Sequence, residues 1–541
     1  MATTTDVLVI GAGPTGLMAA NLLARNGVRV RIVDKKDSPT EETRAIVMHA
    51  KTLELLGKLG LADQAVKEGQ KLNALRVLNE GKSARVLSFE GESARTPYPF
   101  PLIYTQDQTE HLLIQGLDQT EVRVEWNTEL LNMEQAATST QATIRCADGS
   151  QETIEARWII GADGAHSPVR HTLALGFEGE TYKQALFLAD VDLEGNLEDS
   201  EASIGFMPLG FLAFFPMPGK RRFRAVGVLP LEWKDRDAIT VDEVQQVFDT
   251  YRDRTIQITK ARWISVYRTH HRMCERFRVG HVFLVGDAAH IHSPAGGQGM
   301  NTGVGDAYNL AWKLALVIKG QAQPELLDSY EAERMPFARA ILNGSDKAFQ
   351  VQAMSQPFVQ QLKMFGIPLL FRLVTSFAPL RQRAFWLVSQ LWTSYRTSPA
   401  VAPTESGKEG SRAGDRAPYG YFEVGANAGK SVFSLFTDMD HHLLLFAGSR
   451  ADTTDIHLQE MEASTRSLIE AYAMPIQLHT VSKGNVSLQE AYEVEAPTLF
   501  LVRPDGHIAY RGSAQDLSSL RTYLDGLFIK STQDEYIGGV R

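Results

Sequence analysis

Apolar and polar positions follow two different patterns along the chain. Residues 6–10 form a short apolar run, residues 17–26 place apolar side chains at helical spacing, and residues 28–33 form a second apolar run. Residues 181–270 instead contain strand-like segments rich in Phe, Pro and Gly. Residues 281–320 return to the first pattern, an apolar strand followed by a Gly-rich loop and a helix. The pattern predicts an α/β fold interrupted by a sheet of different character.

Beyond residue 320 the pattern predicts helices, a linker and a separate α/β unit. Residues 325–395 have helical spacing, and residues 398–416 are rich in Ser, Gly, Pro and charged residues, which is typical of a linker. Residues 432–525 combine strands and helices and include a predicted hairpin that turns at Asp505 and Gly506. This unit contains no cysteine, which excludes thiol redox chemistry in it.

Two apolar stretches need to be distinguished from membrane segments. Residues 202–219 carry no charge but include several prolines, so two short buried strands are expected rather than one membrane helix. Residues 362–378 are strongly apolar, and a helix packed at a domain or dimer interface is favoured over one lying on a membrane surface. This interpretation leaves a homodimer open.

Composition narrows the class of protein. The chain has 541 residues, enough for about three or four domains. Apolar residues make up 44% and charged residues 22%, as in an ordinary globular enzyme. The net charge of −9 and the lack of a long Lys/Arg run argue against a nucleic-acid partner. The only cysteines, Cys146 and Cys274, exclude a disulfide scaffold and a Cys-rich zinc site, so no metal is expected. No signal peptide or transmembrane segment is predicted, and we expect a cytoplasmic protein.

The first chemical motif is the Gly-rich turn Gly11-Ala-Gly13-Pro-Thr15-Gly16, which follows a predicted strand and opens a predicted helix. In dinucleotide-binding folds the first Gly allows a tight turn, the second lets the backbone approach a pyrophosphate, and the third lets the helix pack on the strand. The helix N-terminus supplies N–H groups to the phosphates. Asp34, at the end of the next strand, can accept hydrogen bonds from ribose hydroxyls. The motif predicts a dinucleotide site without saying which dinucleotide.

A distant second motif points to a flavin. The strand at residues 282–285 leads into Gly286-Asp287, and the Gly-rich loop at residues 293–301 opens a helix. An aspartate at a strand end suits a polyol hydroxyl, and a helix N-terminus suits negative charge on a ring carbonyl. Asp287 is therefore predicted to face the ribityl chain, and the amides of residues 299–301 are predicted to face the pyrimidine edge of the ring.

With the sequence Gly-Ala-Asp-Gly-Ala-His-Ser-Pro-Val-Arg at residues 161–170, these motifs resemble those of the class A FAD-dependent aromatic hydroxylases. This family has the para-hydroxybenzoate hydroxylase-like fold. The similar branch carries a C-terminal thioredoxin-like domain and includes phenol, chlorophenol and 3-(3-hydroxyphenyl)propionate hydroxylases, and polyketide and rifampicin monooxygenases. The resemblance covers nearly the whole chain. The sequence Ala-Pro-Thr at residues 496–498 resembles the cis-Pro strand of thioredoxin, which predicts a cis peptide bond before Pro497.

The resemblance implies an α/β fold with a Rossmann-like FAD-binding domain, an interleaved β-sheet substrate domain and a thioredoxin-like domain. The FAD-binding domain would comprise residues 1–180 and 271–345. The substrate-binding sheet would comprise residues 181–270 with a contribution from residues 72–100. Residues 346–402 would form a helical segment and linker, and residues 403–541 the thioredoxin-like domain, without CxxC, packed on the flavin domain.

The resemblance also assigns roles to individual residues. Non-covalent FAD would be held by Gly11, Gly13, Thr15, Gly16, Asp34, Lys35, Arg44, Gln106, Leu130, Asp163, Asp287, Gly299, Met300 and Asn301. Pro294 would lie over the isoalloxazine, near the substrate ring. Lys51 departs from the family, which often has arginine there, and keeps the charge without the fork geometry of arginine.

The chemistry of such an enzyme is the transfer of oxygen from a flavin C4a-hydroperoxide to an electron-rich ring, with NADPH or NADH as electron donor and O₂ as co-substrate. The chain has no second Rossmann fingerprint, so the nicotinamide nucleotide is expected to visit the FAD site transiently. The protein must bind an apolar aromatic substrate, phenolic or polycyclic, and exclude water. The expected pocket residues are Phe206, Phe211, Phe215, Met217 and Tyr267, and the candidates for a base are Tyr104, His49, Tyr267 and His290.

Two other functions remain open from the sequence. A flavin-dependent reductase or dehydrogenase could use the same fold without transferring oxygen. A flavin-bearing binding or regulatory protein is the third reading, and the intact flavin motifs argue against it. Substrate-dependent oxygen incorporation separates the first two, and any turnover of NADPH removes the third.

Overall fold

The FAD-type motifs lie on a sheet whose central strands are buried and parallel. The computed structural model describes residues 3–41, 45–79, 82–89, 95–207, 210–250, 256–293, 295–353, 366, 370, 373–374, 376–403, 410–449 and 454–531. In the first sheet the order is β17-β18-β11-β1-β2-β8, and the antiparallel strands β10 and β9 extend it from β11. Their bounds are β1 (Thr3–Ile10), β2 (Val30–Val33), β8 (Val124–Glu125), β9 (Glu129–Gln135), β10 (Thr140–Arg145), β11 (Gln151–Gly161), β17 (Arg278–Val279) and β18 (Val282–Leu284).

Parallel pairing of β1 with β2 and β11, and of β11 with β18, brings three distant strand ends to one edge. The apolar run predicted at residues 6–10 is the buried part of β1, as expected for a strand covered on both faces. The carboxyl ends of β1, β11 and β18 carry the three motifs. Ligands of open α/β sheets bind outside such strand ends.

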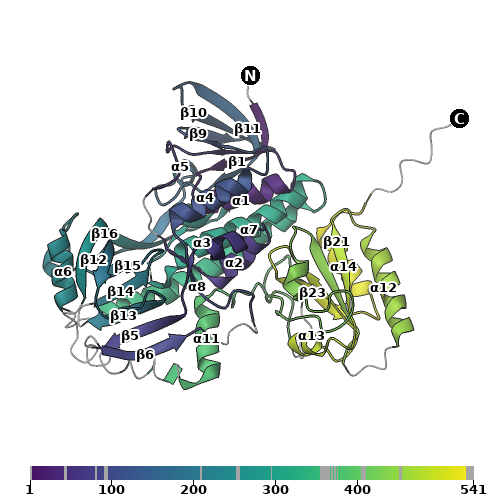
Figure 1. Cartoon of the computed structure of the whole chain (residues 1–541). Helices are drawn as coiled ribbons and strands as arrows, with labels where there is room; N and C mark the ends of the chain where they lie inside the picture. Colours follow the sequence, from purple (N-terminus) through teal and green to yellow (C-terminus); the bar gives the residue numbers. More distant parts are fainter. Residues whose placement is uncertain are drawn as a thin grey trace.

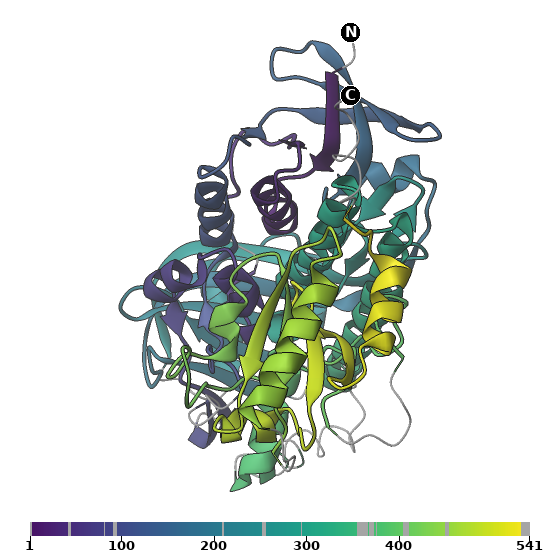
Figure 2. The ribbon, with the colours of Figure 1, turned by 90° about the vertical axis from the view of Figure 1, so that its right-hand side faces the viewer.

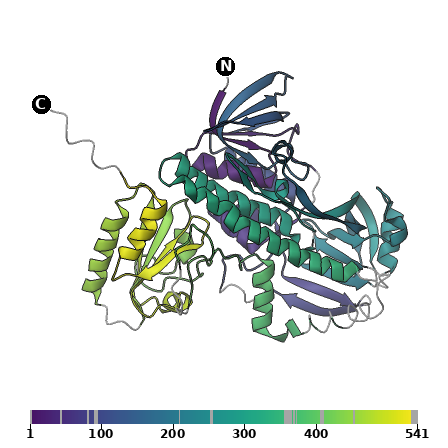
Figure 3. The same ribbon diagram turned by 180° about the vertical axis from the view of Figure 1, so that it is seen from behind.

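Helices cover this sheet and run across the centre of the molecule. α1 (Pro14–Arg25), α4 (Gln106–Leu117) and α7 (Gln298–Ile318) pack together beside the sheet, and α7 is buried along most of its length. Figure 3 shows α7 and the following helix α8 (Asp328–Ala353) crossing the middle of the molecule. Shorter elements are α2 (Ala50–Gly57), α3 (Ala62–Glu68), α5 (Pro168–Thr172), η3 (Gly286–Ala288), η4 (Ala295–Gly297), η5 (Pro324–Leu327) and a small sheet of β3 (Val47–Met48), β7 (Leu102–Ile103) and β4 (Gln70–Lys71).

The second sheet is assembled from three parts of the chain, in the order β19-β16-β12-β15-β14-β13-β5-β6. Its strands are β5 (Ala74–Asn79), β6 (Lys82–Ser88), β12 (Phe177–Glu194), β13 (Glu201–Met207), β14 (Gly210–Pro216), β15 (Arg222–Val228), β16 (Gln257–Cys274) and β19 (His290–Ile291). The helix α6 (Val241–Thr250) packs against this sheet, and the short helix η2 (Leu231–Trp233) follows β15 in the chain. Strands β13 and β14 are the two short strands predicted in the uncharged stretch. Because β5 pairs with β13, a segment from the first part of the chain completes this sheet (Figure 1).

The C-terminal part forms a four-stranded sheet of its own, in the order β21-β20-β22-β23. Its elements are η7 (Val432–Leu435), β20 (His441–Phe446), α12 (Asp455–Ile469), β21 (Ile476–Val481), α13 (Val486–Ala491), β22 (Thr498–Val502), β23 (Ile508–Ser513) and α14 (Ser518–Leu527). β20 is parallel to β21 and antiparallel to β22, and β22 and β23 form the predicted hairpin. Figure 2 shows this domain in the foreground, with the N-terminal strand β1 above it.

The prediction of a cis bond before Pro497 is wrong. The described residues contain no cis peptide bond, so the Ala496–Pro497 bond is trans. The trans form is intrinsically preferred by about 0.5–1 kcal/mol even before proline. Here the trans chain enters β22 directly, and the Pro497 carbonyl accepts a hydrogen bond from the Ala514 N–H at 3.1 Å.

The predicted linker is partly interior. Ser398, Ala400 and Ala402 are buried, and the Ser398 hydroxyl donates to Glu333 at 2.6 Å. Residues 404–409 lie outside the described residues. Much of the apolar stretch 362–378 also lies outside them, and it precedes α11 (Ala378–Val388). In the described part of the chain, no helix is both long enough and apolar enough to cross a membrane.

Candidate functional site

The Gly-rich turn is built as tightly as the motif requires. Gly11 has a φ of +103°, and a Cβ on it would lie 2.3 Å from the Ala162 carbonyl oxygen. A Cβ on Gly16 would lie 1.9 Å from the Gly11 oxygen. Gly13, the residue before α1, has no atom within 4 Å of such a Cβ. The backbone of Gly13 is therefore open to a phosphate at the N-terminus of α1.

Asp34 fastens this turn to the end of β2. Its Oδ2 accepts a hydrogen bond from the Ala12 N–H at 2.6 Å, and its Oδ1 accepts one from the Lys36 N–H at 2.9 Å. A carboxylate has about four lone-pair sites, so each oxygen keeps capacity for a ribose hydroxyl. Lys35 is exposed beside it, and Leu130 is buried in β9.

Gln106 begins α4, and its side chain amide donates to Glu110 at 3.0 Å. Glu110 is fully buried and accepts the Thr40 N–H at 2.8 Å, which holds the segment after β2 against α4. The predicted FAD contacts Arg44 and Pro294 lie outside the described residues.

Asp163 lies just beyond β11 and touches the Gly-rich turn. Its Oδ2 accepts the Val169 N–H at 2.9 Å, whereas its buried Oδ1 has no hydrogen-bond partner among the described residues. Burial raises the pKa of this carboxyl, against the lowering effect of its hydrogen bonds. Arg170 joins the same motif to the third one by donating to the Ala288 carbonyl at 2.9 Å.

The third motif places Asp287 and the first turn of α7 beside the other two. Asp287 is exposed in η3, directly after β18 and opposite Thr15 of α1, since a Cβ on neighbouring Gly286 would lie 2.8 Å from Thr15 Oγ1. Gly297, with a φ of +63°, caps α7, and Gly299 and Met300 follow half-buried in its first turn. The first N–H groups of a helix have no partner within the helix and can face an anion.

The side chain of Asn301 hydrogen-bonds to other residues of the chain and holds the loop before α7 in place. Its Nδ2 donates to the carbonyls of Val47 at 2.9 Å and Gly297 at 2.7 Å. Its Oδ1 accepts the His49 N–H at 2.8 Å and the Thr52 hydroxyl at 2.6 Å. The start of α2 and the loop before α7 are therefore tied into one unit.

Sequence reasoning missed a buried charged cluster behind this loop. Asp306 of α7 accepts from the Gly286 N–H at 3.1 Å, from His290 at 2.6 Å and from Arg334 at 2.7 Å. The cluster fixes the turn that carries Asp287 against α7. Asp306 could be placed on α7 from the sequence, but its partner Arg334 comes from another helix and no local pattern indicates the pairing.

Three of the candidate bases are bonded to other residues of the chain. The Tyr104 hydroxyl donates to Glu68 at 2.8 Å, and burial with this contact raises the pKa of Tyr104. His49 donates from Nε2 to the Gly296 carbonyl at 2.9 Å, and burial lowers the pKa of His49 to about 4. In this geometry His49 supports the loop before α7. His290 is bound to Asp306, as described above.

The expected pocket residues fall into two groups on β14 and its neighbours. Phe215 and Met217 pack with Val47 and Ile103, next to the loop before α7, because a Cβ on Gly297 would lie 3.1 Å from Val47. Phe211 and Tyr267 pack instead around Leu186 and Val228. The side chain of Phe206 lies outside the described residues. Val47 and Phe89 of the first group were not predicted, since neither carries a motif.

Three features of the site fit a bound FAD. They are the open backbone of Gly13 at a helix N-terminus, the buried and unpartnered Oδ1 of Asp163, and the exposed Asp287 carboxylate at the end of β18. All three lie at the same sheet edge, where the strand register brings β1, β11 and β18 together. Within the described ranges, no group of His, Cys, Asp and Glu could hold a metal ion.

Comparison with known proteins agrees with this geometry. The FAD binding domain family matches residues 4–345, and the C-terminal domain of aromatic-ring hydroxylases matches residues 411–530. The chain is 32% identical over 543 residues to 6-methylpretetramide 4-monooxygenase of Streptomyces rimosus, covering 97% of this chain and 94% of that protein. It is 36% identical over 354 residues to pentachlorophenol 4-monooxygenase of Sphingobium chlorophenolicum, covering 64% of each.

A solved structure supports the same relationship over the whole length. The ternary complex of aklavinone-11 hydroxylase with FAD and aklavinone matches with a TM-score of 0.75 and 26% identity, over 96% of this chain and 98% of that one. The sheet edge that collects the three motifs and the matched C-terminal domain lead to one conclusion: the chain belongs to the class A FAD-dependent aromatic-ring hydroxylases and is a flavoprotein monooxygenase.

Proposed function

We propose that the protein uses NADPH or NADH to hydroxylate an apolar phenolic or polycyclic aromatic compound. The observation that carries this proposal is the apolar group of Phe215, Met217 and Val47 beside the first turn of α7. A flat ring can pack on such a wall while facing the flavin site. The related enzymes named above act on 6-methylpretetramide and pentachlorophenol, which supports a phenolic or polycyclic substrate.

The chain's own residues would bind and orient the cofactor. The N-terminus of α1 at Gly13 would hold the pyrophosphate with Thr15 close by, Asp34 with Lys35 the adenosine ribose, and Asp287 the ribityl chain. The predicted contacts of Arg44, Gln106, Leu130 and Asp163 complete this set. Bound FAD supplies hydride acceptance and oxygen activation.

Around the flavin ring the protein would supply charge stabilisation and water exclusion. The first-turn N–H groups at Gly299, Met300 and Asn301 would stabilise the negative charge that develops on the ring. Pro294 lies outside the described residues, so its place over the isoalloxazine stays a prediction. Tyr104 and His49 are bonded to Glu68 and Gly296. Tyr267, which packs with Leu186 and Val228, stays a predicted hydrogen-bond acceptor for a phenolic substrate.

The experiment follows NADPH and NADH oxidation by the holoprotein with and without a panel of phenols and polycyclic phenols, with trapping of hydrogen peroxide and ¹⁸O₂ labelling. A substrate speeds nucleotide oxidation, suppresses peroxide and carries one labelled oxygen. Phe215→Ala should raise the KM for that compound, and Phe214→Ala, whose side chain packs under α6, serves as the control for lost core packing. Oxidation that is fast and indifferent to every aromatic, with no label in any product, would favour the reductase instead.

A further inference from the structure

The hairpin between β22 and β23 reaches from the C-terminal domain into the FAD-binding part. Lys51, in the first turn of α2, donates from Nζ to the Asp505 carbonyl at 2.9 Å. Deeper in the same junction, Arg503 pairs with both oxygens of Glu333 on α8, at 2.6 and 2.8 Å. A cavity of about 20 Å³, the space of one water molecule, lies between Lys51, Asp505 and His507. The two domains therefore meet in a buried polar junction.

The first turn of α2 also carries the contacts that hold the flavin-facing loop. His49, two residues before Lys51, donates to Gly296 from its ring and to Asn301 from its backbone. Thr52, directly after Lys51, donates to the same Asn301 oxygen at 2.6 Å. Lys51 is thus flanked on both sides by residues bonded to the loop at residues 296–301. A shift of this turn would move the loop.

Lys51 differs from Lys313 and Arg334, two buried cations of this junction. Lys313 has Glu333 at 2.8 Å, and Arg334 has Asp306 at 2.7 Å. Among the described residues no carboxylate forms an ion pair with Lys51, and its contact across the junction is the Asp505 carbonyl. Burying an ammonium group without an ion pair costs free energy, and the hydrogen bond from Lys51 to the Asp505 carbonyl offsets part of that cost.

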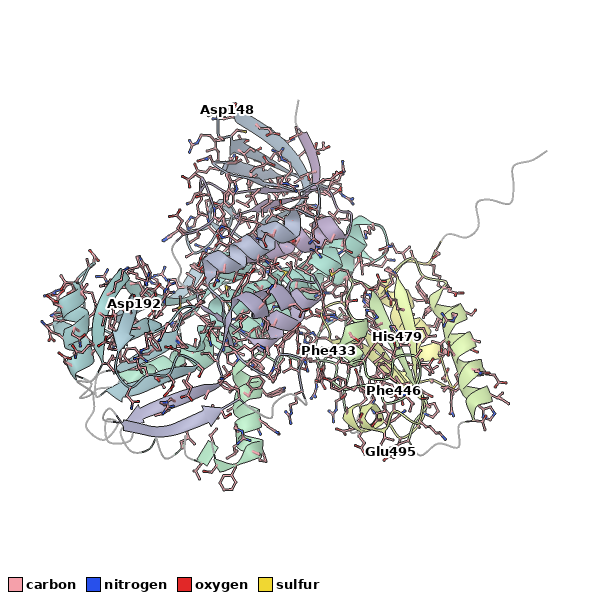
Figure 4. The ribbon with its side chains drawn as sticks, in the orientation of Figure 1. Asp148, Asp192, Phe433, Phe446, His479 and Glu495 are labelled. Carbon is pink, nitrogen blue, oxygen red and sulfur yellow. The ribbon has the colours of Figure 1, made fainter. Side chains whose placement is uncertain are left out.

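Lys58 offers a matched comparison at the other end of α2. Its Nζ donates to the Phe436 carbonyl at 2.9 Å and lies 5.4 Å from the centre of the Phe436 ring. Phe433, one turn earlier, lies on the side of the C-terminal domain that faces α2 (Figure 4). Lys58 therefore makes the same kind of contact with the same domain, but within the described ranges neither of its chain neighbours forms a hydrogen bond with the loop at residues 296–301.

We propose that Lys51 is a positioning residue through which the C-terminal domain sets the flavin site: the Asp505 carbonyl holds Lys51, and the first turn of α2 then holds the loop at residues 296–301. The inference rests on the proposed role of that loop as the flavin-facing one. It gives the cysteine-free C-terminal domain a part in the geometry of the flavin site.

The test compares Lys51→Met with Lys58→Met in the full chain. FAD is titrated into each apoprotein, the visible spectrum and midpoint potential of the bound flavin are recorded, and thermal unfolding is followed separately. We expect Lys51→Met to weaken FAD binding about tenfold or more and to shift the spectrum or potential, and Lys58→Met to leave the flavin unchanged, whichever way each variant moves the Tm. Lys51→Arg, which can donate to the same carbonyl, should restore the flavin properties.

Equal effects of both variants on the flavin, or an effect of Lys51→Met on the Tm alone, would overturn the proposal. If Lys51→Met does not fold, Lys51→Gln, which retains a shorter donor, is compared with Lys58→Gln by the same readouts and criteria. The test measures flavin binding and not hydroxylation. A wild-type protein that binds FAD but hydroxylates no aromatic would therefore refute the proposed function while leaving this comparison decisive.

Discussion

The contact between α1 and α7 at Thr15 makes a quantitative prediction for Gly303→Ala. Gly303 lies in the buried part of α7, and a Cβ on it would stand 2.3 Å from Thr15 Oγ1 and 3.2 Å from the Gly286 Cα. The nearest obstacle is thus a single hydroxyl oxygen on a stiff β-branched side chain. The next neighbours of the new methyl group would be only moderately tight.

Two opposing effects set the size of the change. Overpacking of this kind costs about 1–3 kcal/mol, whereas replacing Gly by Ala inside a helix gains about 1 kcal/mol. Gly303→Ala alone should therefore destabilise by about 0–2 kcal/mol. In a Thr15→Ala background the hydroxyl is gone and the nearest Thr15 atom, Cβ, is 3.5 Å away. The helix gain should then dominate, which gives a favourable coupling of about 1–3 kcal/mol between the two substitutions.

The assay is a double-mutant cycle on the apoprotein, so that any loss of FAD contacts at Thr15 does not enter the result. A protein with several domains need not unfold in one step, so the transition of the FAD-binding part is followed by two probes. For a domain of 150–250 residues, 1 kcal/mol corresponds to about 2–4 °C in Tm. Additive effects of the two substitutions would refute the reasoning, because they would show that the Thr15 hydroxyl is not what the new methyl group meets.

Three further predictions concern other parts of the molecule. Asp34→Ala should weaken FAD binding about tenfold or more, and Asp34→Glu should weaken it less, as titration of the apoprotein would show; equal losses would contradict a contact through the carboxylate. Arg224→Met should lower the free energy of unfolding in urea by about 3–5 kcal/mol, because it leaves the Asp190 carboxylate buried and unpaired. Arg262→Met breaks the more exposed pair with Asp192 on the same sheet (Figure 4) and should lower it by at most about 1 kcal/mol. Similar losses in the two variants would contradict the role of burial. Burial lowers the pKa of Lys58 from its ordinary 10.5 to about 7, so between these values the folded state binds fewer protons than the unfolded state. The free energy of unfolding should therefore rise with pH from about 7 to 10, and it should rise less in Lys58→Met. An equal rise in both proteins would contradict this assignment to Lys58.

Elements with a local pattern could be predicted from the sequence. The apolar run before Gly11, the helical spacing after Gly16 and the next apolar run gave β1, α1 and β2 within a few residues of their observed bounds. The loop before α7 was placed in the same way, because glycines after an apolar strand indicate a helix entry. Parallel pairing then brings these strand ends together, so the family and the flavin site follow from short segments of sequence.

Side-chain partners could not be predicted where they come from distant segments. Tyr104 and His49 were candidates for a base because they lie beside motifs, and the structure gives them the partners Glu68 and Gly296. Val47 carries no chemical signal in the sequence, and it joins the apolar group only because β3 lies against the loop before α7. The error at Pro497 is of a similar kind: the resemblance indicated the strand correctly but predicted a cis bond where the chain is trans.

The domain junction depends on side-chain partners from distant segments of the chain. Glu333 accepts from Lys313, Arg503 and Ser398, which come from α7, the β22–β23 hairpin and the segment between α11 and the C-terminal sheet. Removing any one element would take a hydrogen bond from the buried Glu333 carboxylate, at a cost of about 1–3 kcal/mol or more. An apolar junction of the same size could slide or repack, but this one is satisfied only when all three elements are in place. The charges therefore select one relative position of the C-terminal domain, which is what a domain must have if its hairpin is to hold Lys51 and the flavin-facing loop.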